Sequence, residues 1–162
     1  MIRAIAAIDD KLGIATDTGI PWHIQADSDY FRATTKSGKI LMGYATYREF
    51  AQPLPDRPNY VATNHATTLR DGFLIADDVD AFLKGGDASD IWVIGGATLF
   101  ASTLDSLQEL YLTRVSGDFH CTKFFPAFEP AFHLETDIPS PMVEGTPAIR
   151  FQVWSRVAQA KP

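Results

Sequence analysis

Short apolar runs alternate with amphipathic stretches along the first two thirds of this 162-residue chain. Four runs are apolar on both faces, as is typical of strands that helices cover on both sides. These predicted strands are Ile2–Ile8, Lys39–Gly43, Tyr60–Thr63 and Ile91–Ile94. Helical patterns are found at Ala26–Thr35, Thr46–Ala51, Val79–Leu83 and Thr98–Leu104. The alternation of strand and helix predicts an α/β fold with a largely parallel sheet.

The C-terminal third has a different pattern. Glu109–Val115, Phe132–Thr136 and Ala148–Val157 have the character of strands without helices between them, so we expect antiparallel edge strands on the same sheet. The prolines of 52–58 predict an ordered turn, and 138–145 is expected to be a surface loop. Neither segment resembles a linker, so we expect one domain over residues 1–162.

Composition narrows the class of protein. A net charge of −6 argues against a general nucleic-acid binder, although a few local arginines still suit a small anionic ligand. The single cysteine, Cys121, excludes an internal disulfide and fits a reducing cytosol. The apolar run Ala4–Ile8 is too short for a signal-peptide core, and no run approaches the length of a membrane span. We therefore expect a cytoplasmic protein.

The most informative segment is Gly19–Phe31, which places Asp27 at the start of an amphipathic helix. Phe31 lies four residues later on the same helix face, and Trp22 precedes the helix. A carboxylate beside large aromatic side chains suggests an apolar cleft, where burial favours the protonated form near neutral pH. The alternative is an ordinary acidic residue in the first turn of a helix, and for an isolated Asp that interpretation is preferred.

Two junctions between a strand and a helix contain glycine. Gly95 and Gly96 follow one predicted strand and Gly43 ends another, with a helix beginning at once in each case. Such junctions let the backbone approach a ligand and offer free N–H groups to phosphates at the carboxyl edge of an α/β sheet. The Gly-x-Gly-x-x-Gly fingerprint is absent, and each junction alone is equally well explained as a tight turn.

Arg57 lies in the proline-rich turn, where its guanidinium would be held ready for a carboxylate, although a solvated surface arginine is the commoner case. The four histidines are scattered without metal-ligand spacing, so no metal site is expected. The pairs Asp9–Asp10 and Asp77–Asp78 are better explained by turns than by a two-carboxylate hydrolase site.

In their order and spacing, these motifs resemble dihydrofolate reductases over nearly the whole chain. The matching residues are Ile5-Ala6-Ala7, Ile20-Pro21-Trp22, Asp27 with Phe31, Met42-Gly43, Thr46, Pro53-Leu54-Pro55 with Arg57, Ile94-Gly95-Gly96, Tyr111-Leu112-Thr113 and Phe125-Pro126. The resemblance implies a three-layer α/β fold: a mostly parallel eight-stranded sheet with flanking helices and an antiparallel C-terminal edge strand. It also implies NADPH as cofactor, hydride transfer to C6 of 7,8-dihydrofolate with protonation at N5, and a monomer.

The resemblance also implies roles for individual residues. Asp27 would bind the pterin and promote its protonation, Thr113 would fix that carboxylate, and Trp22 would hold a water. The pterin and benzoyl rings would contact Ile5, Phe31, Leu54 and the Ile94 carbonyl, and Arg57 would bind the glutamate α-carboxylate. The residues implied to bind NADPH are Ala7, Ile14, Gly43, Tyr44, Ala45, Thr46, Thr63, Asn64, His65, Gly95, Gly96, Ala97, Thr98 and Leu99.

Some positions depart from the family pattern. Tyr44 stands where many bacterial members carry an arginine, and His65 is a weak cation at neutral pH, so we expect a smaller preference for NADPH over NADH than is usual in the family. Ser28 replaces a usual leucine at the benzoyl ring. Two other interpretations stay open: a pyrimidine reductase of riboflavin synthesis, which Asp27, Phe31 and Arg57 together argue against, and a binding module without activity.

Overall fold

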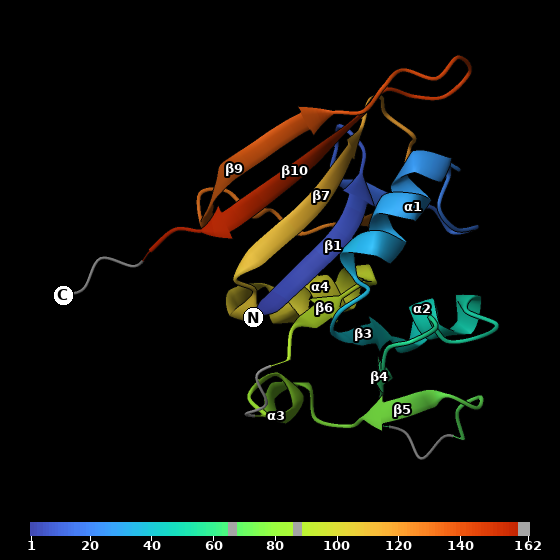
Figure 1. The fold of residues 1–162 in the computed structure, drawn as a ribbon, viewed down its shortest axis with the longest axis vertical. Helices are drawn as coiled ribbons and strands as arrows, with labels where there is room; N and C mark the ends of the chain where they lie inside the picture. Colours follow the sequence, from blue (N-terminus) through green and yellow to red (C-terminus); the bar gives the residue numbers. More distant parts are fainter. Residues whose placement is uncertain (65–67, 86–88, 159–162) are drawn as a thin grey trace.

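The computed structural model describes residues 1–64, 68–85 and 89–158 (Figure 1). The strands are β1 (Ile2–Ile8), β2 (Gly13–Ala15), β3 (Lys39–Gly43), β4 (Asn59–Ala62), β5 (Phe73–Ala76), β6 (Ile91–Val93), β7 (Glu109–Val115), β8 (Lys123–Phe124), β9 (Phe132–Pro139) and β10 (Ile149–Arg156). The helices are α1 (Gln25–Thr34), α2 (Tyr44–Glu49), α3 (Val79–Leu83), α4 (Ala97–Thr103) and the 3₁₀ turn η1 (Leu104–Ser106).

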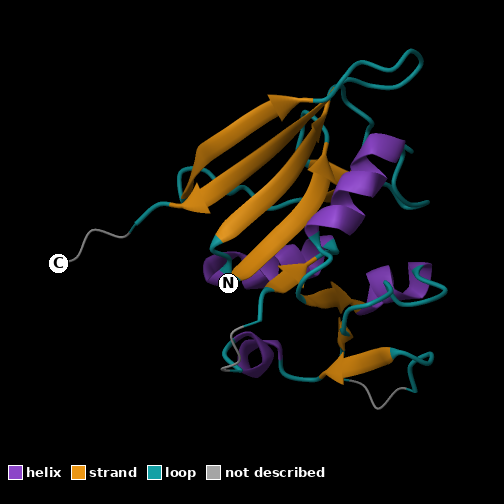
Figure 2. Cartoon of the chain, viewed as in Figure 1, coloured by secondary structure: helices purple, strands orange, loops and turns teal. Residues whose placement is uncertain are grey.

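Eight of the strands form one twisted sheet in the order β5-β4-β3-β6-β1-β7-β10-β9 (Figure 2). All pairs from β5 to β7 are parallel, whereas β10 runs antiparallel to both β7 and β9. β2 and β8 form a separate antiparallel pair. The predicted α/β fold with a mostly parallel eight-stranded sheet is therefore confirmed.

Each face of the sheet carries its own apolar core, because successive side chains of a strand point to opposite faces. On β1, Ala4 and Ile8 belong to a cluster that includes Phe100 of α4, whereas Ile5 belongs to a second cluster that includes Tyr47 of α2. Helices α3 and α4 thus cover one face, and α1 and α2 cover the other (Figure 1). The fold has three layers, as expected.

Two details of the predicted sheet are wrong. Glu109–Val115, expected to be antiparallel, pairs in parallel with β1, because α4 and η1 return the chain to the start of the sheet before β7 begins. The antiparallel C-terminal strand β10 lies one place in from the edge, which β9 occupies. Strands β2, β5 and β8 were not among those predicted, although Phe73–Ala76 is a four-residue apolar run.

The proline-rich turn is ordered, as predicted, and a buried amide holds it. Asn59 is 1% exposed. Its Nδ2 donates to the carbonyls of Leu54 and Arg57 at 2.9 and 2.8 Å, and its Oδ1 accepts from the Leu54 N–H at 3.0 Å. The first residue of β4 therefore fixes Leu54 and Arg57 relative to the sheet. In the described part of the chain, no helix has the length and apolar character needed to span a bilayer.

The central strand β7 supplies a stability prediction. Leu112 is fully buried between β1 and β10, so Leu112→Ala should lower the free energy of unfolding by about 2–5 kcal/mol. Leu134→Ala, in edge strand β9 and 42% exposed, is the matched control and should cost roughly 0.5 kcal/mol or less. Urea unfolding measures both, and equal losses would contradict the assignment of the core.

Candidate active site

One large cavity, about 1080 Å³, lies at the carboxyl ends of the parallel strands. Its walls come from the last residues of β1, β3 and β4, from the segment after β6, and from α1, α2 and α4. Ligands of open α/β sheets bind at this edge. The volume exceeds that of a typical pocket for one small ligand and suits two ligands side by side.

Asp27 lies in the first turn of α1 and faces this cavity. Its backbone N–H donates to the Ile24 carbonyl at 3.1 Å, which begins the helix. Burial raises the pKa of the Asp27 carboxyl, and a hydrogen bond with Thr113 opposes part of that rise. Thr113 is 1% exposed and stands on β7 beside Ala7 of β1. The cavity thus contains a carboxyl group that holds its proton to a higher pH than an ordinary Asp does.

The wall around Asp27 is apolar. Ile5, Phe31, Leu54 and Ile94 line the cavity and pack in the core cluster of the α1–α2 face. Trp22 also lines the cavity, is only 6% exposed, and packs edge-on against Phe119 with ring centroids 5.1 Å apart. All five were predicted from the sequence, and the fold brings them from four separate segments to one place.

The two glycine junctions meet at the floor of the cavity. The Gly43 N–H donates to the Gly95 carbonyl at 2.7 Å. Gly95 has a φ of +125°, which an L side chain rarely adopts, and a Cβ on Gly95 or Gly96 would lie 3.6 or 3.5 Å from the Thr46 hydroxyl. The backbone is therefore open to a ligand at this point. The predicted cofactor residues here all line the cavity: Gly43, Tyr44, Ala45, Thr46, Gly95, Gly96, Ala97, Thr98 and Leu99, together with Ala7 and Ile14.

A buried carboxylate anchors the segment that carries Ile14. Asp9 is 0% exposed and accepts backbone N–H bonds from Lys11, Gly13 and Phe119 at 2.9, 2.8 and 3.0 Å. Burial alone would raise the pKa of Asp9, but these N–H groups hold its pKa below the ordinary value. The turn prediction for Asp9 is confirmed, and its carboxylate joins this turn to residues 117–121.

Gly13 stands where no side chain fits, because a Cβ would lie 2.4 Å from the Cβ of Cys121. Burial, followed by the nearby Asp9 charge, raises the pKa of the Cys121 thiol to about 11. A thiol with this pKa is protonated at neutral pH and is a poor nucleophile. The close packing explains why glycine occupies this position.

Four predicted site residues do not line the cavity. Thr113 lies behind Asp27, Thr63 is 8% exposed at the end of β4, and Asn64 is exposed beyond it. Arg57 donates to the Pro55 carbonyl at 2.8 Å, to the Thr35 hydroxyl at 2.9 Å and to the Arg32 carbonyl at 3.3 Å. These bonds use only part of the guanidinium. His65 lies outside the described residues.

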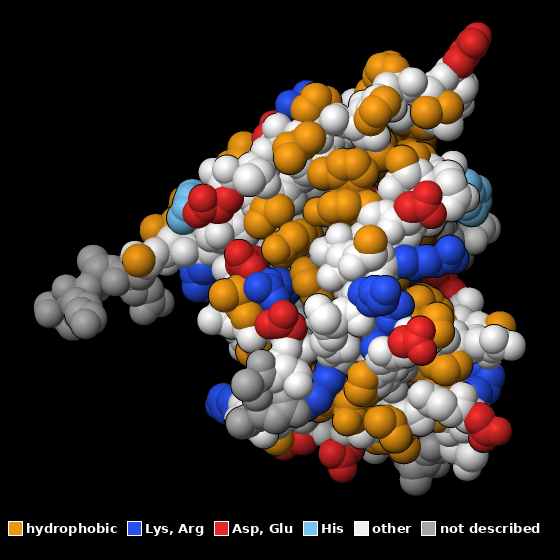
Figure 3. Space-filling model, viewed as in Figure 1, with side chains coloured by type: hydrophobic (Ala, Val, Ile, Leu, Met, Phe, Trp, Pro, Cys, Tyr) orange, Lys and Arg blue, Asp and Glu red, His pale blue; other side chains and the backbone are white. Residues whose placement is uncertain are grey.

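Several lining residues were not predicted: Arg32, Glu49, Phe50, Ser102 and Lys123. Arg32 lies four residues after Ser28, on the same helix face, so helical spacing would have found it. Lys and Arg side chains gather between α1 and α2 on the face seen in Figure 3. Lys123 comes from β8, and no local signal in the sequence marks it.

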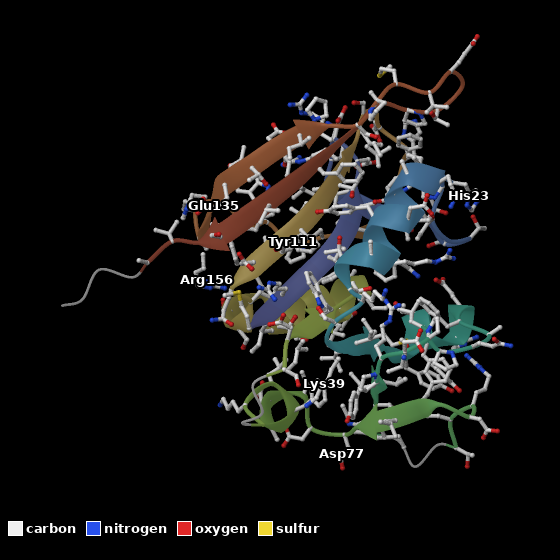
Figure 4. All side chains as sticks on the ribbon, viewed as in Figure 1. His23, Lys39, Asp77, Tyr111, Glu135 and Arg156 are labelled. Atoms are coloured by element: carbon white, nitrogen blue, oxygen red, sulfur yellow. The ribbon has the colours of Figure 1, made fainter. Side chains whose placement is uncertain are left out.

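The remaining candidate clusters lie elsewhere. Among the described residues, no group of three His, Cys, Asp or Glu side chains is arranged to hold a metal ion. Asp77 lies between β5 and α3 at the bottom of the view, whereas His23 lies near the start of α1 at the upper right (Figure 4). Its neighbour Asp78 caps α3 by accepting from the Ala81 N–H at 3.0 Å, which confirms a turn role for this pair.

Comparisons with known proteins agree with this geometry. The dihydrofolate reductase type 3 of Salmonella typhimurium is 33% identical over 129 residues, which cover 79% of this chain and 80% of the relative. The dihydrofolate reductase of Bacillus subtilis (strain 168) is 31% identical over 130 residues, covering 80% of this chain and 77% of the relative.

A solved structure also matches the fold. The dihydrofolate reductase of Enterococcus faecalis, complexed with NADP(H) and RAB-propyl, superposes with a TM-score of 0.88 and 25% identity over 96% of both chains. A model of the dihydrofolate reductase family matches residues 1–156. On these grounds, the chain belongs to the dihydrofolate reductase family.

Proposed function

We propose that Asp27, Thr113 and Trp22 form the catalytic centre of an NADPH-dependent dihydrofolate reductase, which reduces 7,8-dihydrofolate to 5,6,7,8-tetrahydrofolate. The observation that carries this assignment is the Asp27 carboxyl group, which faces an apolar cavity and has a raised pKa. Membership of the family supports the reaction. When bound, NADPH supplies the hydride that reduces C6 of the pterin.

Asp27 binds and orients the pterin in this proposal. A carboxylate accepts two parallel N–H bonds, which matches the 2-amino group and N3 of the pterin ring. In its protonated form, which the raised pKa favours, Asp27 would release a proton that a water held by Trp22 would pass to N5 as C6 receives the hydride. Thr113 fixes the carboxyl group by its hydrogen bond and so selects one orientation of the ring.

The apolar wall and Arg57 would bind the remaining parts of the substrate. Ile5, Phe31 and Leu54 would contact the pterin and benzoyl rings, and the Ile94 carbonyl would bind the pterin edge. Arg57 would bind the α-carboxylate of the glutamate tail, because Pro55, Thr35 and Arg32 hold the guanidinium and reduce the entropy lost on binding.

The glycine floor fits a dinucleotide. Its bare backbone at Gly43, Gly95 and Gly96 leaves open space that side chains would fill, with the Thr46 hydroxyl beside it. Ala7 and Ile14 would lie against the nicotinamide, and the residues Tyr44, Ala45, Thr46, Ala97, Thr98 and Leu99 would surround the diphosphate. Thr63, Asn64 and His65 would bind the 2′-phosphate.

We also propose that the chain acts as a cytoplasmic monomer of one domain over residues 1–162, without a nucleic-acid or membrane partner. The negative net charge supports the absence of nucleic acid. The core that contains Ala4 of β1 also contains Phe132 of β9 and Trp154 of β10, which supports a single folding unit.

Steady-state oxidation of NADPH, and separately of NADH, with 7,8-dihydrofolate tests the function directly. We expect turnover with NADPH and measurable turnover with NADH, because the half-exposed Tyr44 phenol cannot form an ion pair with the 2′-phosphate. Absence of turnover with both cofactors would contradict the proposal and favour the riboflavin-pathway reductase or a binding module.

Asp27→Asn should lower turnover with dihydrofolate by about 10²–10⁴-fold at neutral pH, the usual contribution of a general acid–base group. In the wild type, turnover should fall as the pH rises through the raised pKa of Asp27, because the acid form is lost. The variant should lack this fall. Full activity of the variant would remove Asp27 from the mechanism.

Thermal unfolding supplies the control for this variant. Between the pKa of unfolded Asp and the raised folded pKa, the native state holds a proton that the unfolded chain has lost, so ionised Asp27 destabilises the fold above that window. Asp27→Asn should therefore be at least as stable as the wild type at pH 7. Loss of activity with an unchanged or higher Tm then reports chemistry rather than unfolding.

Arg57→Ala should raise the KM for dihydrofolate by roughly 10- to 100-fold, the value of a charge-assisted hydrogen bond, with a smaller effect on kcat. The KM for dihydropteroate, which lacks the glutamate tail, should change little. Arg48→Ala, an exposed arginine of α2 outside the cavity lining, is the matched control. An unchanged KM for dihydrofolate, or equal increases for both substrates, would refute the role of Arg57.

A further inference from the structure

The lysine and arginine side chains that line the cavity stand at two separate places. Arg32 lies on α1, and its carbonyl accepts from Arg57, which lies beside Arg32 without lining the cavity. Lys123 lies on β8, which pairs with β2 outside the main sheet, and it lines the same cavity as the glycine floor. In the proposed reaction, dihydrofolate and the dinucleotide both carry negatively charged groups. The two arginines lie where the glutamate tail of dihydrofolate is proposed to bind, so they do not provide a cation for the dinucleotide.

The floor proposed for the cofactor provides no side-chain cation. Residues 95–99 read Gly-Gly-Ala-Thr-Leu, and residues 43–46 read Gly-Tyr-Ala-Thr. The other charged groups of the lining are Asp27 and Glu49, which are acidic. Within the described ranges, the Lys123 ammonium group takes part in no salt bridge. A lysine without a salt bridge among the described residues therefore lines the same cavity as the floor proposed to accept the cofactor phosphates.

The sheet order limits which phosphate Lys123 can reach. Lys123 pairs with Ala15, in the segment that follows β1, whereas Thr63 and Asn64 follow β4. β4 and β1 are three strand positions apart, roughly 14 Å at the usual spacing. β2 contacts β1, and β1 neighbours β6 in the sheet. The topology therefore places Lys123 nearer to the glycine junction after β6, where the diphosphate is proposed to bind, than to the residues beyond β4.

We infer that Lys123 is a cofactor-binding residue whose ammonium group pairs with the diphosphate of the bound nicotinamide dinucleotide. This inference rests on the proposed function. Because β8 pairs with β2, the same contact links the cofactor to the segment that carries Ile14 and Ala15. Cofactor binding and the position of that segment are then coupled, since a bond to Lys123 stabilises the β2–β8 pair.

The test is equilibrium binding of NADPH and of NADH, measured by quenching of tryptophan fluorescence without substrate. Lys123→Gln should raise Kd for both dinucleotides by the same factor, roughly 3- to 10-fold at low salt, with a weaker dependence of Kd on salt. Lys123→Arg should restore binding. Lys11→Gln is the matched control, because Lys11 is an exposed lysine of the neighbouring turn that does not line this cavity.

Each other outcome overturns the inference. An increase in Kd for NADPH alone would place the contact at the 2′-phosphate. An equal effect of Lys11→Gln would indicate long-range electrostatic attraction rather than a direct contact. Unchanged binding would exclude the contact. If the wild-type protein binds neither dinucleotide, it is the proposed function that fails, whereas tight wild-type binding with no effect at Lys123 refutes the inference alone.

Discussion

The alternation of side chains along β1 is the constraint on which the fold and the cavity both depend. Ala4 and Ile8 fill the core beneath α4, and Ile5 fills the core beneath α2 while also lining the cavity. A shift of one residue in register would exchange these faces. It would turn Arg3 toward the core beneath α4. It would also move Ala7 away from Thr113, the residue that forms a hydrogen bond with Asp27. The geometry of the site is thus set by pairing in the middle of the sheet, with β6 on one side and β7 on the other.

Asp27 shows how that sheet creates a reactive acid at a cost to stability. Its helix begins without a side-chain cap, and the carboxyl group turns inward to Thr113 instead of outward to water. Burial without a cation partner is unfavourable for the charged form, so the proton is retained to a higher pH. Asp9 has the opposite outcome, although its side chain is not exposed to solvent. Three backbone N–H groups compensate its charge, and its pKa falls. The hydrogen bonds around each carboxylate, and not its depth alone, separate the reactive acid from the anchoring one.

The strands and helices that the sequence predicts correctly are those that a local pattern of residues determines. Ile2–Ile8, Lys39–Gly43 and Val79–Leu83 have the predicted bounds because each is a continuous apolar or amphipathic run. β2 and β8 are three and two residues long, and they exist because distant segments pair, which no local pattern reveals. The site divides in the same way. Asp27, Phe31 and the glycine junctions carry local signals, whereas Lys123 reaches the cavity only through the β2–β8 pair. The bonds that hold Arg57 likewise come from the end of α1, 22 residues away at Thr35.

The segment after β1 connects these observations, because it is fixed at its base and lies over the cavity further on. Asp9 and Gly13 hold the base against residues 117–121, and the Thr122 hydroxyl donates to Asp17 at 2.9 Å further along. Thr16 and Gly19 exchange backbone hydrogen bonds in a turn of their own, and Ile20 beyond it is 53% exposed although it lines the cavity. An apolar side chain half in water gains free energy when a ligand covers it. A ligand that covers Ile20 would therefore stabilise this segment, whose base Asp9 holds in place.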